Sequence, residues 1–63
     1  MPFVEIHMVE GRTQEQKDDM IAKVTDAVAE SIDVSKEKIW IKIHDAPKEN
    51  WGFGGIPRYK KEH

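Results

Sequence analysis

Pro2 has the most specific chemistry that this sequence offers, because it directly follows Met1. An initiator methionine is normally removed when the next residue is as compact as proline, and Pro2 would then carry a free secondary amine. An α-amino group titrates at about 7.7–8.0, and although a prolyl amine is more basic, a nearby cation and a dry pocket would lower its pKa. Pro2 is therefore a candidate general base. The alternative is that Pro2 merely follows the start codon.

His7 and His44 are candidates for a metal-binding pair, because both are expected on the outer faces of strands. A histidine that binds a metal needs further ligands and partners that orient its ring. The sequence shows no such ligands beside these two residues, so we expect no metal. The chain also has 0 Cys, which excludes thiolate metal sites and disulfides.

The size and charge of the chain limit its class. Sixty-three residues make one small domain, which buries only about 60% of the surface of its unfolded chain. Without disulfides or a metal, oligomerisation is the remaining route to stability. The net charge of -2 gives no cationic surface for nucleic acid or an anionic membrane. No apolar run is long enough to cross a membrane, and no signal peptide is evident, so we expect a cytoplasmic protein.

The pattern of apolar residues predicts three main elements. Alternation predicts strands at Phe3–Val9 and at Ile39–His44. Between them, Thr13 and Gln16 have the spacing of a capping box, which predicts a helix from Thr13 to about Ile32. The helix should bury an apolar stripe against the strands, formed by Met20, Ile21, Val24, Ala27, Val28 and Ile32.

The C-terminal third predicts a turn followed by a hairpin. The turn is expected at residues 46–50, the Gly-rich hairpin at residues 51–57, and a frayed tail at residues 58–63. Two parallel strands under one helix cannot be stable alone, and the opposite face would leave Phe3 and Trp40 in water. The predicted class is α+β, a β-α-β subunit that oligomerisation completes.

The pattern as a whole resembles the 4-oxalocrotonate tautomerase family. The likeness rests on Pro2 at the head of a strand, on the run HMVEGRT from His7 to Thr13 with EQK at 15–17, and on GFGG at 52–55. It covers nearly the entire chain, so we expect residues 1–63 to form a single tautomerase domain from which Met1 is removed. The resemblance implies a homo-oligomer, a hexamer built as a trimer of dimers, that works without a cofactor or metal.

The resemblance also implies a reaction and a set of site residues. Family members interconvert enol and keto forms of unsaturated 2-oxo acids such as 2-hydroxymuconate. Pro2 would move the proton between the 2-hydroxyl and C5, and Arg12 would bind the distal carboxylate of this small-molecule substrate. Trp51 falls where the family has a Phe that walls the site and keeps the proline pKa low. The backbone of Val9 would lie near the substrate oxygens.

Trp40 departs from the family pattern. Well-known members carry a second Arg at this position, which another subunit delivers to the oxygens of the substrate. Trp has no charge and cannot donate a bidentate pair to a carboxylate. Lys42, two residues further along the same strand face, could compensate in part. The departure makes substrates with one carboxylate, or bulkier aryl substrates that stack on Trp40, plausible beside the diacid.

Other functions stay open at this point. The fold could serve as a non-enzymatic oligomeric binding module, above all if Met1 stays attached and Pro2 is an amide. A phenylenolpyruvate-type tautomerase would use the same proton transfer on another substrate. A hydrolytic dehalogenase relative would need a carboxylate to activate water, and neither Glu5 nor Asp45 is obviously placed for that role.

Overall fold

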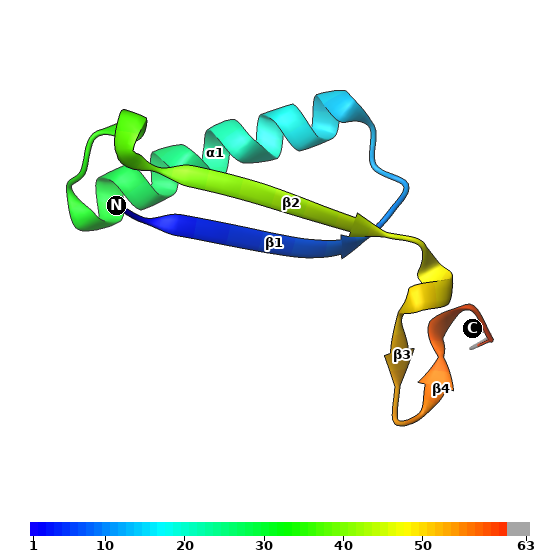
Figure 1. Ribbon diagram of the computed structural model, residues 1–63. Helices are drawn as coiled ribbons and strands as arrows, with labels where there is room; N and C mark the ends of the chain where they lie inside the picture. The colour runs from blue at the N-terminus through cyan, green and yellow to red at the C-terminus, as the bar shows by residue number, and fades with distance from the viewer. Residues whose placement is uncertain (61–63) are drawn as a thin grey trace.

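Two parallel strands and one long helix form the main body of the molecule (Figure 1). The computed structural model describes residues 1–60. Strand β1 (Phe3–Val9) leads into helix α1 (Gln14–Ile32), and strand β2 (Trp40–Ala46) returns beside β1. A small hairpin of β3 (Gly52–Phe53) and β4 (Ile56–Pro57) follows, so the predicted α+β class is confirmed. Short 3-10 turns occupy Lys36–Lys38 (η1), Lys48–Asn50 (η2) and Arg58–Lys60 (η3).

The strand register divides the sheet into two different faces. Val4 pairs with Ile41 and Ile6 with Ile43, and these half-buried side chains lie on the face that α1 covers. Among residues 1–60, no helix covers the opposite face. Its cross-strand pairs are Phe3 with Trp40, Glu5 with Lys42, His7 with His44 and Val9 with Ala46.

Helix α1 begins with the predicted capping box. The Gln16 backbone N–H donates to Thr13 Oγ1 over 3.1 Å, and the Thr13 N–H donates to Gln16 Oε1 over 2.9 Å. Two backbone donors at the start of the helix are thereby satisfied. The helix ends after Ile32, where Asp33 adopts a left-handed conformation with φ 57°. Lys36 follows the helix, and its pKa is raised because its side chain forms a hydrogen bond with the Asp26 carboxylate and feels the negative charge of that group.

The predicted bounds of the second strand were wrong at its C-terminal end. The strand continues through Asp45 to Ala46, and the Ala46 carbonyl accepts a further hydrogen bond from Glu10 N–H over 2.9 Å. The apolar alternation stops at Asp45 because this polar residue lies on the helix-facing side of the sheet. Its carboxylate is 2.7 Å from Lys17 Nζ on α1. An ion pair between distant parts of the chain therefore replaces the apolar contact that the pattern required.

The hairpin turns at Gly54 and Gly55, as the glycine content predicted. Both residues have positive φ, 55° and 84°, which is the requirement of the two-residue turns that suit hairpins. The predicted frayed tail was wrong for residues 58–60, since they form η3 and the Arg58 N–H donates to the Trp51 carbonyl over 2.6 Å. Residues 61–63, the rest of that predicted tail, lie outside the described residues.

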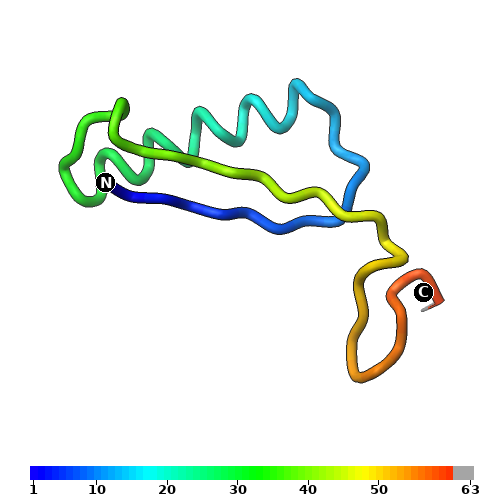
Figure 2. Tube along the Cα trace, in the orientation of Figure 1, coloured from blue at the N-terminus to red at the C-terminus, as the bar shows by residue number. Residues whose placement is uncertain are grey.

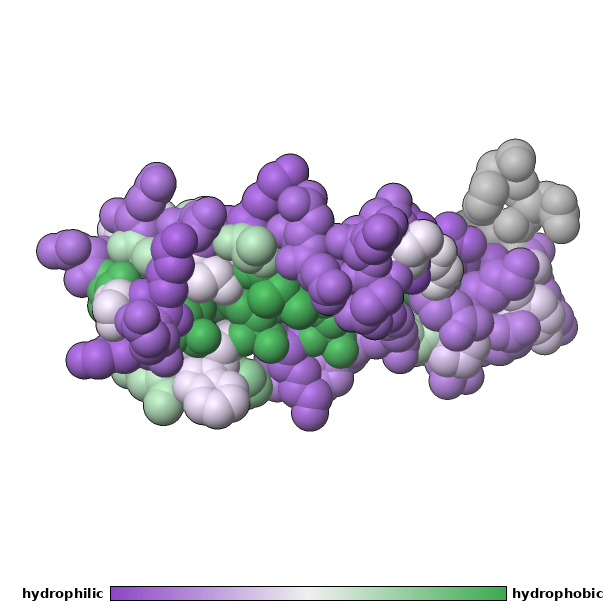
Figure 3. Space-filling view, turned by 90° about the horizontal axis from the view of Figure 1, so that it is seen from above, coloured by the Kyte–Doolittle hydropathy of each residue, from purple (hydrophilic) through white to green (hydrophobic). Residues whose placement is uncertain are grey.

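The single chain leaves its apolar surface largely uncovered. No side chain among residues 1–60 is buried, and Ile32, Phe3, Trp40 and Phe53 are each more than half exposed. Figure 2 traces the chain from Met1 at one end of an elongated molecule to the hairpin at the other. The radius of gyration is 15.0 Å, against about 11 Å for a compact domain of this length. Figure 3, a view from above, shows an apolar patch among hydrophilic side chains.

The helical content gives no sign of a membrane span. Across the described part of the chain, no helix combines the length and the apolar character that crossing a bilayer requires.

Candidate functional site

Pro2 lies at the N-terminal end of β1, beside the start of β2. Its carbonyl accepts a hydrogen bond from the Trp40 backbone N–H over 3.1 Å, and its ring is half-buried. The bond ties the backbone of Pro2 to the start of the neighbouring strand. Trp40 and its cross-strand partner Phe3 are 58% and 60% exposed. The N-terminal end of the sheet thus presents a candidate base flanked by two open aromatic rings.

Val9, Arg12 and Trp51 lie at the other end of the sheet. Val9 is the last residue of β1 and is half-buried, while Arg12 is exposed in the connection from β1 to α1. Trp51 follows η2 at the base of the hairpin and is half-buried. Its indole Nε1 is shielded from solvent and has no hydrogen-bond acceptor among the described residues. A buried N–H without an acceptor is costly, so this donor is suited to a group from outside the subunit.

The two groups of site residues are therefore separated within one chain. The seven residues of β1 separate Pro2 from the other end, and a strand rises about 3.3 Å per residue, which places the groups about 23 Å apart. Figure 1 shows this arrangement, with the N-terminus at one end of β1 and the hairpin beyond the other. The structure thus brings Pro2 and Trp40 together but does not bring either of them to Arg12. A site that uses both ends has to combine residues from two chains.

A cavity at the Arg12 end was not foreseen from the sequence. It has a volume of about 330 Å³ and lies between α1 and β2, where Gln14, Lys17, Ile21, Ile43 and Asp45 line it. None of the five predicted site residues is among these lining residues. The ion pair between Lys17 and Asp45 forms part of the cavity wall.

Three side chains on the uncovered face of the sheet also form a group that the sequence did not reveal. The carboxylate of Glu5 lies beside the imidazoles of His7 and His44. His7 and His44 were candidates for a metal-binding pair. Glu5 lies near His44 because of the register between β1 and β2, which the sequence pattern alone does not give. Its position two residues before His7, on the same strand face, is the signal that could have found it.

Known proteins with similar sequences share one activity in their names. The family model described as a tautomerase enzyme matches residues 2–57. A protein from Comamonas testosteroni named 2-hydroxymuconate tautomerase is 48% identical over 56 residues, which cover 89% of each chain.

Solved structures of similar shape carry related titles. A chain from a study of 4-oxalocrotonate tautomerase isozymes of Methylibium petroleiphilum has a TM-score of 0.86 and 50% identity, and the match covers 92% of this chain and 94% of that one. A chain of a heterohexamer 4-oxalocrotonate tautomerase from Chloroflexus aurantiacus has a TM-score of 0.91 and 31% identity, covering 98% and 100%. With a family match over most of its length, and with relatives whose fold and element order it shares, this chain belongs to the tautomerase family of isomerases.

Proposed function

We propose that this protein is a cofactor-independent keto-enol tautomerase that acts on 2-hydroxydienoates and 2-oxo acids such as 2-hydroxymuconate, with the amine of Pro2 as general base and acid. The observation that carries the proposal is the placement of Pro2 at the head of β1, tied by its carbonyl to Trp40, in a chain of the tautomerase family. The proposal requires removal of Met1, because only then is the Pro2 nitrogen an amine.

The reaction in this proposal is a proton transfer between two atoms of the substrate. The Pro2 amine takes the proton of the 2-hydroxyl group, and the electron pair left on oxygen forms the keto group. The double bonds shift along the chain toward C5, and the protonated Pro2 then delivers its proton to C5. No atom is gained or lost overall, so the reaction needs no co-reactant. A positioned base of this kind accelerates proton transfer by about 100- to 10,000-fold.

Arg12 and Trp51 have complementary roles in the proposed site. The Arg12 guanidinium binds the distal carboxylate in a bidentate manner and draws electron density toward the carbon that accepts the proton. The half-buried Trp51 ring walls the site, excludes water and so helps to keep the proline pKa low. Its shielded indole N–H, which lacks an acceptor among the described residues, supports a contact with substrate or with another chain. The backbone of Val9 borders the substrate oxygens.

The proposed active assembly is a homo-hexamer made from dimers. Pro2 and Arg12 lie at opposite ends of β1, so a dimer that places two sheets edge to edge in opposite directions brings the Pro2 of one chain to the Arg12 of the other. The same pairing would continue a two-stranded sheet that is unstable alone. The exposed Phe3, Trp40 and Phe53 supply apolar surface for contacts between dimers. The similar chain from Chloroflexus aurantiacus belongs to a heterohexamer, which supports an assembly of six chains.

Trp40 directs the proposed substrate preference. With this neutral ring beside Pro2, Arg12 is the main fixed cation of the proposed site, and Lys42 lies further along the strand opposite Glu5. A substrate that one guanidinium anchors, and whose other end packs on Trp40, fits this set of residues best. The proposal is therefore that mono-acids with an apolar or aryl end are processed alongside 2-hydroxymuconate.

The test combines intact mass with an ultraviolet assay. The purified protein should have the mass of the chain without Met1, and it should accelerate conversion of 2-hydroxymuconate and of an aryl enolpyruvate to their keto forms. A folded, Met-free protein that converts neither enol acid faster than buffer alone would contradict the proposed function.

A further inference from the structure

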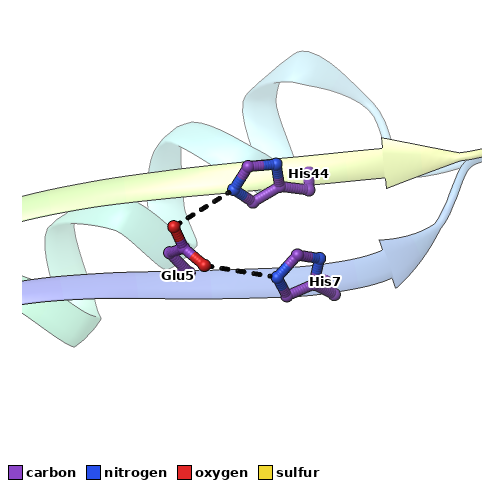
Figure 4. A group of neighbouring side chains, drawn as sticks. All are labelled: Glu5, His7 and His44. Carbon is purple, nitrogen blue, oxygen red and sulfur yellow. Dashed lines mark ion pairs between the residues drawn. The ribbon is translucent and has the colours of Figure 1, made fainter.

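Glu5, His7 and His44 converge on the face of the sheet that α1 does not cover. The Glu5 Oε1 atom is 3.5 Å from His7 Nε2, and Glu5 Oε2 is 3.9 Å from His44 Nε2. The two imidazole rings stack with centroids 4.4 Å apart and planes 10° from parallel. Figure 4 shows the result: both Nε2 atoms point toward the same carboxylate.

These three groups approach one another without forming hydrogen bonds. The two nitrogen–oxygen separations exceed the 2.7–3.2 Å of an ordinary N–H···O bond. The Nε2 atom of His44 is shielded from solvent, yet it has no hydrogen-bond partner among the described residues. A shielded nitrogen without a partner, facing a carboxylate and a second imidazole, is the arrangement expected where a further atom completes the contacts.

The spacing of the donor atoms suits a tetrahedral metal ion. Zn²⁺ binds imidazole nitrogen and carboxylate oxygen at about 2.0–2.2 Å, which places neighbouring donors about 3.3 Å apart. The donor atoms of Glu5, His7 and His44 all lie within 4.8 Å of one another. Binding requires the two stacked rings to turn so that both Nε2 lone pairs point at one ion. In the single chain, the side chains of Glu5 and His7, 48% and 57% exposed, have room to turn.

We propose that Glu5, His7 and His44 form a binding site for a divalent transition-metal ion of the Zn²⁺ type, one ion per chain. Two imidazoles and one carboxylate are a donor set that such ions prefer, and three protein ligands leave one position for water. We expected no metal from the sequence because no third ligand was evident beside the two histidines. Glu5 is that third ligand.

The proposed ion has a structural role that does not depend on the tautomerase activity. Glu5 and His7 come from β1 and His44 comes from β2, so the ion cross-links the two strands on their uncovered face. The ligands start three residues after Pro2, about 10 Å along the strand, and the ion therefore stays away from the proposed base. Lys42, the exposed cross-strand neighbour of Glu5, is the nearby charge that opposes a cation.

Isothermal titration of the intact, metal-free protein with Zn²⁺ tests the proposal. We expect one ion per chain, and binding at least about 100-fold weaker in each of Glu5→Gln, His7→Gln and His44→Gln, since even indirect partners of a metal change affinity by 10- to 100-fold. Bound Zn²⁺ should also raise the melting temperature of the parent but not of the variants. Glu5→Gln keeps the size of the side chain, so it remains informative if a histidine variant fails to fold.

Two control variants separate this site from other Zn²⁺ contacts. Lys42→Gln changes the same strand face without removing a ligand, and it should bind Zn²⁺ as tightly as the parent or more tightly. His63→Gln removes the remaining histidine of the chain and should bind as the parent does. Unchanged affinity in folded Glu5→Gln, His7→Gln or His44→Gln, loss of binding in His63→Gln alone, or no saturable binding to the parent would overturn the proposal.

Discussion

The two ends of the sheet carry different and complementary groups. At the N-terminal end, the Pro2 carbonyl is bonded to the backbone of Trp40, and the side chains of Phe3 and Trp40 are exposed. At the other end lie a cation, Arg12, and the half-buried Trp51 beside the hairpin. The proposed base, Pro2, lies at one end, whereas Arg12, the proposed carboxylate-binding cation, lies at the other. Neither end alone has the groups that the proposed reaction needs.

This difference shows how a chain of 63 residues can contribute to a site that needs residues from two chains. Uncovered apolar surface and an elongated shape already favour association, since no side chain of residues 1–60 is buried. Association in opposite directions would also join the two unlike ends. Stability and the proposed active site would then depend on the same contacts. Variants of Pro2 or Arg12 that leave the assembly intact can separate catalysis from stability.

The largest effect is expected from blocking the Pro2 end. Pro2→Gln removes the secondary amine, and its bulkier second residue should also retain Met1. We expect about 100- to 10,000-fold lower kcat on 2-hydroxymuconate, because the general base is lost. Pro2→Ala, which leaves a more flexible primary amine, should lose activity only in part. Mass spectrometry verifies the N-terminus, and parent-like kcat in a Met-retaining protein would exclude Pro2 as the base.

At the opposite end, Arg12→Ala should have the next largest effect. A charge-assisted hydrogen bond contributes about 1.5–3 kcal/mol, so kcat/KM should fall about 10- to 100-fold for any acid substrate. Arg12→Lys should recover part of this loss, because a point charge replaces the bidentate group. Lys48→Ala removes another exposed cation at this end and should leave kcat/KM unchanged. Equal losses in Arg12→Ala and Lys48→Ala would argue for a general charge effect instead.

Replacing the neutral Trp40 beside Pro2 by a cation should change substrate specificity rather than abolish activity. Trp40→Arg supplies a second cation, so kcat/KM for 2-hydroxymuconate should rise about tenfold relative to that for an aryl enolpyruvate. Trp40→Phe keeps an apolar ring and should keep the parent ratio. If the ratio in Trp40→Arg does not move toward the diacid, Trp40 does not contact substrate or Lys42 already supplies the second charge.

The smallest effect is expected from the ion pair that joins α1 to the end of β2. Lys17 and Asp45 are 2.7 Å apart, with side chains only 21% and 30% exposed. Lys17→Met should lower the free energy of unfolding by about 1–2 kcal/mol, measured by urea denaturation at one protein concentration. The exposed pair of Lys23 and Asp19 is the control, and Lys23→Met should change stability by less than about 0.5 kcal/mol. Equal changes would mean that the Lys17 pair is no stronger than a surface pair.

What the sequence predicted depended on how local each interaction is. The capping box of Thr13 and Gln16 could be predicted because its two hydrogen bonds join residues three positions apart. The end of β2 could not be predicted, because Asp45 faces the helix and pairs there with Lys17, which lies 28 residues earlier in the sequence. The grouping of Glu5 with the two histidines likewise requires the strand register.

The candidate site was predicted as a set of residues but not as an arrangement. Pro2, Val9, Arg12, Trp40 and Trp51 were named from their chemistry and from the family likeness, and their roles remain predictions. Their division between two ends follows from β1, which lies between Pro2 and Arg12 as one extended strand. The sequence predicted this strand. That it keeps Pro2 and Arg12 of one chain apart becomes clear only from the three-dimensional structure.

The most direct test of a site shared between chains is complementation. Pro2→Gln and Arg12→Ala chains, each with little activity alone, are combined in mixed assemblies and assayed on 2-hydroxymuconate. Random pairing makes about half of the pairs mixed, and each mixed pair has one intact site of two, so we expect about a quarter of the parent activity. If the mixed assemblies, verified by native mass spectrometry, show only the residual activities of the two variants, Pro2 and Arg12 do not act together across chains.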